Sequence, residues 1–344
     1  MSTVYNYYDS YYGHSIDDLQ TIVEYFRTKN GGNKSSSLVF LAGDSSMDNK
    51  HWFTQRSAAV NGYENILDPP ESKKDICYWV NKQIVERKLG RTMTCINSAV
   101  EESSIGTRAC NYLQEHDKFI QTNISQDDIL VVSVGGNDIA LKPNLCTIIN
   151  AALLLYTQNA KSMDRLSCGA PLSCDDCCLG CGFSCLSNCT ACPCGYGYFL
   201  HLFKTRAQTY ISNLIKLKKP KKVLVCMIYY VDEKITGGWA DASMAALGYN
   251  KNPGDLQMLT RLIYENATKK IQFDGVETIA VPFFTVMDGK TSGDYCERVE
   301  PSAQGGSKMA QIIMDAIEGG QPAMDRYYEE HLEKISGTEY IDRN

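Results

Sequence analysis

The sequence lacks the features of an exported or membrane-spanning protein. Its first residues, MSTVYNYYDS, hold no basic segment followed by an apolar run, and no apolar run reaches the about 20 residues that cross a bilayer. A concentrated basic surface is also lacking, since the net charge is -6 and the one lysine-rich run, 216–222, is typical of a solvated helix C-terminus. We therefore expect a cytoplasmic protein with no signal peptide, no transmembrane segment and no nucleic-acid partner.

Apolar runs with strand character alternate with helical patterns along most of the chain. The expected strands are residues 37–42, 92–97, 129–134, 222–229 and 276–283. The expected helices are residues 15–28, 73–89, a segment ending near 120, 147–161, 198–217, 255–271 and 302–317. This alternation predicts an α/β fold in which a parallel five-stranded sheet is covered on both faces by helices.

The first candidate site follows the first expected strand. Residues 39–47 read VFLAGDSSM, so an apolar run breaks at Gly43 and delivers Asp44 and Ser45 to the carboxyl end of the strand. Ligands of parallel sheets bind at that edge, which makes Ser45 a candidate nucleophile. An ordinary turn or helix cap is the alternative, because Gly-Asp-Ser also suits both.

A second candidate site follows the third expected strand. Residues 133–139 read SVGGNDI, in which Gly136 lets the backbone approach a ligand and Asn137 offers a side-chain amide donor. A hydroxyl on one strand end and an amide donor on another favour a nucleophile beside an oxyanion donor over a simple turn.

Four blocks resemble the SGNH (GDSL-type) hydrolases: Gly43-Asp44-Ser45 after the first strand, Asn97 after the second, residues 135–138 (GGND) after the third, and a proline-containing segment before the last helix. The resemblance covers nearly the whole chain and implies a three-layer α/β/α flavodoxin-like fold. It also implies that Ser45 is the nucleophile and Asn137 part of the oxyanion hole. The cleft residues that it implies are Gly43, Asp44, Asn97, Glu102, Gly136 and Asp138.

The last block departs from the family pattern of Asp-x-x-His. Here the Asp position is Glu297 and the His position is Glu300. The five histidines of the chain are His14, His51, His116, His201 and His331, none of them at an expected strand end. The second block departs too, because Glu102 takes the place of a glycine whose amide assists the oxyanion hole; Ser103, Ser104 and Gly106 are alternative alignments.

These departures change the chemistry that is expected. Glutamate has an ordinary pKa of about 4.3 and is a weak base at pH 7, although burial beside a second carboxylate, Glu297, raises it and Arg298 lowers it. Loss of a triad member typically costs about four orders of magnitude in rate. Two functions follow: a catalytically degenerate protein that binds a ligand or acts as a structural subunit, or an ester hydrolase in which Ser45 attacks and Glu300 is the base.

Nine of the fifteen cysteines lie between residues 168 and 194. Pairs at C-x-x-C spacing match tetrahedral zinc, and disulfides, S-acylation and free thiols are the alternatives. The candidate ligands of a structural zinc ion are Cys174, Cys177, Cys178, Cys181, Cys185, Cys189, Cys192 and Cys194.

The expected organisation is a tyrosine-rich and poorly ordered tail at 1–14, a hydrolase-like domain at 15–335, a cysteine-rich insertion at 163–197 within it, and a C-terminal tail at 336–344. Protein partners are expected to bind the insertion or the N-terminal tail. A small-molecule ester or a carbohydrate is the expected ligand of the hydrolase-like site, which needs no cofactor.

Overall fold

The computed structural model describes residues 3–29, 37–90, 92–108, 112–139, 141 and 196–341. The helix expected at 147–161 and the eight candidate zinc ligands lie outside these residues.

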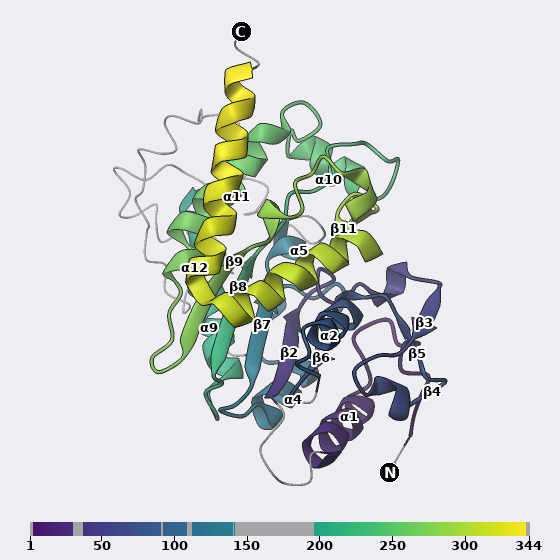
Figure 1. Cartoon of the computed structure of the whole chain (residues 1–344). Coiled ribbons are helices and arrows are strands. Elements are labelled where there is room, and N and C mark those ends of the chain that lie inside the picture. Colours follow the sequence, from purple (N-terminus) through teal and green to yellow (C-terminus); the bar gives the residue numbers. More distant parts are fainter. Residues whose placement is uncertain are drawn as a thin grey trace.

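A five-stranded parallel sheet forms the centre of the molecule, as predicted (Figure 1). Its spatial order is β6 (Met93–Asn97), β2 (Ser37–Gly43), β7 (Ile129–Ser133), β8 (Lys222–Met227) and β9 (Glu277–Pro282). All four pairings are parallel. Because the chain passes from β2 to one neighbour and then to the other, the strand order reverses beside β2. Ligands of doubly wound sheets bind at such a switch point.

Two apolar clusters, one on each face of the sheet, hold the layers together. Alternate residues of β2 divide between them: Phe40 belongs to one cluster and Leu41 to the other, and neither is exposed. The first cluster is completed by α1 (Ile16–Lys29), α4 (Glu115–Asn123), α9 (Ala207–Leu214) and α11 (Pro253–Asn266). The second is completed by α2 (Ile76–Glu86) and α12 (Ala303–Ile341). The sheet is therefore the middle of three layers.

Short elements complete the described chain. Three two-stranded pairs are β1 (Val4–Tyr5) with β4 (Leu67–Asp68), β3 (Arg56–Ala58) with β5 (Glu71–Lys73), and β10 (Tyr295–Cys296) with β11 (Glu300–Pro301). The short α-helices are α3 (Ile105–Arg108), α5 (Gly136–Ile139), α8 (Tyr196–Leu200) and α10 (Ala240–Ala246). Single turns of 3₁₀-helix are η1 (Lys50–Trp52), η2 (Tyr63–Asn65), η5 (Thr268–Lys270), η6 (Phe283–Thr285) and η7 (Ser292–Asp294), and η4 (His201–Arg206) is a π-helix.

The prediction of a poorly ordered N-terminal tail was wrong. The rings of Tyr7 and Tyr8 are buried, and Tyr7 stacks on buried His14 with 3.8 Å between ring centroids. The Gly13 amide donates a hydrogen bond of 2.9 Å to Asp48 Oδ2, which ties the segment to the loop after β2. Tyrosine rings gain enough from burial to order a short polar segment.

The closing helix is longer than expected. α12 changes direction at Gly320, where φ is 62°, just before Pro322, and then continues to Ile341, beyond the expected domain end at 335. Figure 1 shows this last part, in yellow, projecting from the body of the molecule. The helix expected at 198–217 is instead α8, η4 and α9 in succession.

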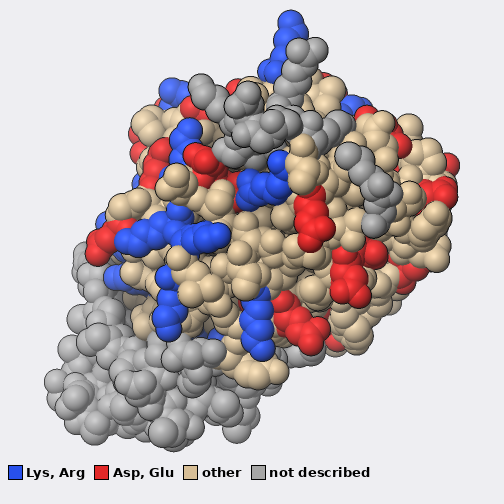
Figure 2. All heavy atoms as spheres, turned by 90° about the horizontal axis from the view of Figure 1, so that it is seen from below, with Lys and Arg blue, Asp and Glu red and all other residues tan. Residues whose placement is uncertain are grey.

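Neither the surface charge visible in Figure 2 nor the length of the helices singles out a nucleic acid or a membrane as a partner within the described residues. On the face shown in Figure 2, lysine and arginine side chains lie next to aspartate and glutamate side chains in several places. That face therefore carries both signs of charge. None of the helices within the described residues is both long and apolar enough to span a bilayer.

Candidate functional site

Ser45 lies in a tight turn at the carboxyl end of β2. Gly43 makes the turn with a φ of 150°, and a Cβ at this position would lie 2.0 Å from the carbonyl oxygen of Ser133 on β7. Only glycine fits so close to the neighbouring strand. The turn leaves the Ser45 side chain 6 % exposed, at the edge of the sheet where the sequence placed it.

Glu300 reaches Ser45 from the opposite end of the chain. Ser45 Oγ donates a hydrogen bond of 3.0 Å to Glu300 Oε1 across 255 positions of sequence. Glu300 sits on β11, directly before α12. The structure therefore brings together the predicted nucleophile and the carboxyl group at the histidine position.

The pKa of Glu300 is raised to about 8. Burial is the main cause and the nearby carboxylates of Asp44 and Asp48 add to it, whereas the hydrogen bond from Ser45 lowers it. The expected influence of Glu297 and Arg298 is not found. The Glu297 carboxylate lies beside Gly238, and the Arg298 guanidinium binds the Asp232 carbonyl and the Asp241 carboxylate.

Further carboxyl groups surround this pair. Burial raises the pKa of Asp44 to about 6, and burial together with Glu300 and Asp48 raises the pKa of Glu101 to about 9. Two cations offset them in part, because Lys50 Nζ lies 2.6 Å from Asp48 Oδ1 and Arg108 lowers the pKa of Asp44. We call Asp44, Asp48, Glu101 and Glu300 the acidic cluster. Its mutual repulsion favours neutral carboxyl groups.

Several of the predicted oxyanion donors bind oxygen atoms of the protein itself. Asn137 Nδ2 donates a hydrogen bond of 2.9 Å to the Ser103 carbonyl. The Asp138 carboxylate accepts hydrogen bonds of 2.8 Å from the amides of Ile105 and Gly106, so the Gly106 amide proposed as an alternative oxyanion donor is occupied. Other amides of this segment that donate to protein oxygens are those of Ala99, Val100, Glu101 and Ser103.

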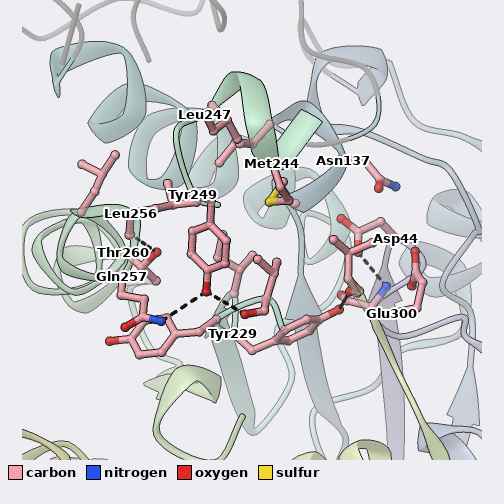
Figure 3. A pocket seen from close by; sticks show the side chains of 18 of the residues that line it. Asp44, Asn137, Tyr229, Met244, Leu247, Tyr249, Leu256, Gln257, Thr260 and Glu300 are labelled. Carbon is pink, nitrogen blue, oxygen red and sulfur yellow. Dashed lines mark hydrogen bonds between the residues drawn. The ribbon is translucent and has the colours of Figure 1, made fainter. Parts of the chain in front are cut away.

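A mainly apolar pocket opens beside Ser45, with a cavity volume of about 90 Å³. Asp44, Ser45 and Glu300 line one end of it, together with Gly136 and Asn137. Figure 3 shows Asp44 and Glu300 at that end, with Tyr249 and Leu256 toward the other. The far wall comes from the segment 228–231, α10 and α11.

Four predicted cleft residues do not line this pocket. Asn97 is fully buried, donating to the Met47 carbonyl and accepting from the Ala99 amide. The Glu102 carboxylate accepts a hydrogen bond from the Tyr11 hydroxyl. Gly43 and Asp138 support the site from outside the pocket, through the turn and the amide contacts described above. Glu297 also lies outside the lining residues.

Other residues of the site were missed from the sequence. Asp48 and Lys50 follow Ser45 closely in sequence. Two charged residues so soon after the predicted nucleophile could have indicated that they belong to the site. Glu101 directly precedes Glu102, which was named from the sequence instead. Only the fold shows which of these two adjacent glutamates is buried. No group of three metal-ligating side chains lies together within the described ranges. The zinc prediction falls on residues outside those ranges and stays a prediction.

No family model matches the chain, and no curated protein matches it. Solved structures similar to it include an acetylxylan esterase from Geobacillus stearothermophilus, at 11% identity and a TM-score of 0.43, over 83% of this chain and 95% of that one. A GDSL-like lipase from Parabacteroides merdae is 13% identical, with a TM-score of 0.40, over 82% and 96%. A lipase/acylhydrolase from Enterococcus faecalis is 11% identical, with a TM-score of 0.39, over 82% and 96%. With identities this low, a function has to come from the chemistry of the site itself.

Proposed function

We propose that this chain is an SGNH-hydrolase-like protein that binds an apolar small molecule at Ser45 and does not hydrolyse esters at neutral pH. The observation that carries the proposal is the hydrogen bond between Ser45 and the buried Glu300, whose pKa is raised to about 8. It stands in a site where the Asn137 side chain and the Gly106 amide already donate to protein oxygens.

The first requirement for hydrolysis, a base that activates the Ser45 hydroxyl, is not met at pH 7. A serine hydroxyl attacks an ester only when a base takes its proton. With a pKa of about 8, Glu300 carries its own proton in most molecules at pH 7 and accepts none from Ser45.

The second requirement is a set of hydrogen-bond donors for the tetrahedral intermediate, and it is poorly met here. An oxyanion needs donors aimed at it, and the loss of one donor costs about 3 to 4 kcal/mol in the barrier. Here Asn137 donates to Ser103 and the Gly106 amide donates to Asp138. The Asp44 carboxyl group, whose pKa of about 6 leaves it mainly ionised at pH 7, repels any further negative charge that develops nearby.

Ligand binding, by contrast, is supported by the pocket. Apolar side chains such as Met244, Leu247 and Ile263 line most of it, and a few polar groups are gathered at one end. Small-molecule sites typically combine these two features.

Hydrolysis of a short activated ester, measured from pH 5 to 9, tests the proposal. We expect the same background rate at pH 7 from wild type and from the variants Ser45→Ala and Glu300→Gln. The control is Glu329→Gln, which changes an exposed glutamate of α12 and should show that rate as well. A rate well above background at pH 7 that is lost in the first two variants and kept in the control would overturn it.

A second function, alkaline ester hydrolysis, is favoured by the same hydrogen bond. Above about pH 8 Glu300 becomes a carboxylate 3.0 Å from the serine hydroxyl, placed to take its proton. This function predicts a rate that rises toward pH 9 and falls to background in both site variants. A flat pH profile would exclude it.

A further inference from the structure

The two ends of the pocket differ in chemistry. One end is acidic, with Asp44 and Glu300, and the rest is lined mainly by apolar and aromatic side chains. In Figure 3 the acidic end lies apart from Met244, Leu247 and Leu256. A ligand that fills the whole pocket therefore needs a polar head and an apolar tail.

Glu300 has an unused oxygen at the acidic end. Its side chain is only 5 % exposed and lines the pocket, and while Oε1 accepts from Ser45, Oε2 is buried with no hydrogen-bond partner. Buried polar atoms in folded proteins are ordinarily paired, so an unpaired oxygen on a residue that lines a pocket marks a place for a ligand atom.

The charged groups around Glu300 determine which charge the head group of a ligand can carry. Asp44 and Asp48 face it from the loop after β2 and Glu101 from the loop after β6. The other titratable neighbours are Tyr229, after β8, and Cys296, on β10. Lys50, which lies beside this cluster, is bound to Asp48 and to the Tyr11 carbonyl. An anionic head would be repelled here and a cationic one attracted.

We propose that this pocket binds a primary ammonium ion carrying a short apolar tail, with the ammonium group donating to Glu300 Oε2 and the tail lying against α10 and α11. The inference rests on the proposed binding function and names its ligand class. An ammonium group has three donors and no acceptor, which matches an end that offers carboxyl oxygens. The cavity volume of about 90 Å³ favours a tail of a few carbons.

Binding would also move a proton. Burial raises the pKa of Glu300 to about 8 in the free protein, so the group is mainly neutral at pH 7.5. An ammonium ion stabilises the carboxylate. The ammonium keeps its three protons, Glu300 loses one, and that proton passes to the buffer.

Calorimetric titration of the full chain with n-hexylamine at pH 7.5, in two buffers of different ionisation enthalpy, tests the inference. The matched probes are 1-hexanol and hexanoate, which share the tail and change the head. We expect hexylamine to bind about thirtyfold more tightly than hexanol, and hexanoate to bind more weakly than either. Only the binding enthalpy of hexylamine should depend on the buffer.

Three variants localise the effect. Glu300→Gln should weaken hexylamine binding about thirtyfold and remove the buffer dependence while leaving hexanol unchanged. Glu329→Gln should change neither. Leu247→Trp, at a partly buried position of the pocket wall, should weaken both hexylamine and hexanol, and thermal unfolding of each variant checks that it is folded.

The possible failures are distinguishable. Equal binding of hexylamine and hexanol, both weakened by Leu247→Trp, would overturn the ammonium inference and leave the proposed binding function standing. Tight hexylamine binding that Glu300→Gln does not weaken would also overturn the inference, as would binding of Mg²⁺ with none of hexylamine. Absence of binding by all three probes would remove both the inference and the proposed function.

Discussion

The nucleophile half and the oxyanion half of this site are built on neighbouring strands, and they differ in what remains available to a substrate. After β2, Ser45 still forms a hydrogen bond with a group at the position of the missing base. After β7, Asn137 turns its amide to the Ser103 carbonyl and Asp138 occupies two backbone amides. The hydroxyl of the predicted nucleophile thus keeps a carboxyl partner beside the pocket, whereas the predicted oxyanion donor Asn137 binds a protein oxygen.

The nucleophile half depends most on Gly43, and its replacement should give the largest effect. Gly43→Ala places a Cβ 2.0 Å from the Ser133 carbonyl at a φ of 150°, so β2 and β7 must separate locally. We expect a loss of about 3 kcal/mol or more in the free energy of unfolding, measured by urea denaturation.

The matched control is Gly237→Ala. Gly237 also has a positive φ, 82°, but a Cβ there meets nothing within 4 Å. Backbone strain alone should cost about 1–2 kcal/mol. If the two variants lose the same stability, the close approach of the β2 turn to β7 is not what fixes Ser45.

The ionisation of Glu300 should make the free energy of unfolding depend on pH. Glu300 has an ordinary pKa of 4.5 and a folded-state pKa of about 8, so the folded protein holds one proton more than the unfolded chain between these values. The stability that the neutral group contributes is fully present below about pH 4.5 and is lost as the pH rises to about 8. The total loss is on the order of a few kcal/mol.

Glu300→Gln removes this contribution, because glutamine stays neutral. We expect the variant to match wild type near pH 4.5 and to be the more stable of the two at pH 8, as measured by urea denaturation across this range. Glu329→Gln, on the exposed face of α12, should follow wild type throughout. If wild type and Glu300→Gln keep parallel profiles, Glu300 is ionised in the folded protein and the case for a silent nucleophile weakens.

The parts of the site that the sequence predicted are those set by strand ends. Alternation of apolar runs and helices located Ser45 and Asn137, because a parallel sheet brings all its carboxyl ends to one edge. Glu300 was located by the resemblance of the segment before α12 to the last block of the SGNH hydrolases. The partners of these groups could not be predicted. The Asn137 amide pairs with Ser103, 34 residues away, and Asp48 pairs with Gly13, 35 residues away. Such contacts depend on loop conformations that no local pattern encodes.

The oxyanion half should respond to substitution through stability alone. Asn137→Ala leaves the Ser103 carbonyl without its side-chain donor in a buried site, and such a loss costs about 1–3 kcal/mol. Gln208→Ala removes a similar amide-to-carbonyl hydrogen bond, to Gln272, at an exposed position and should change stability by less than about 0.5 kcal/mol. Neither variant should alter ester hydrolysis at pH 7. Were Asn137→Ala to keep its stability and lose hydrolysis instead, the Asn137 amide would be serving a reacting oxygen, and the two halves of the site would be working together.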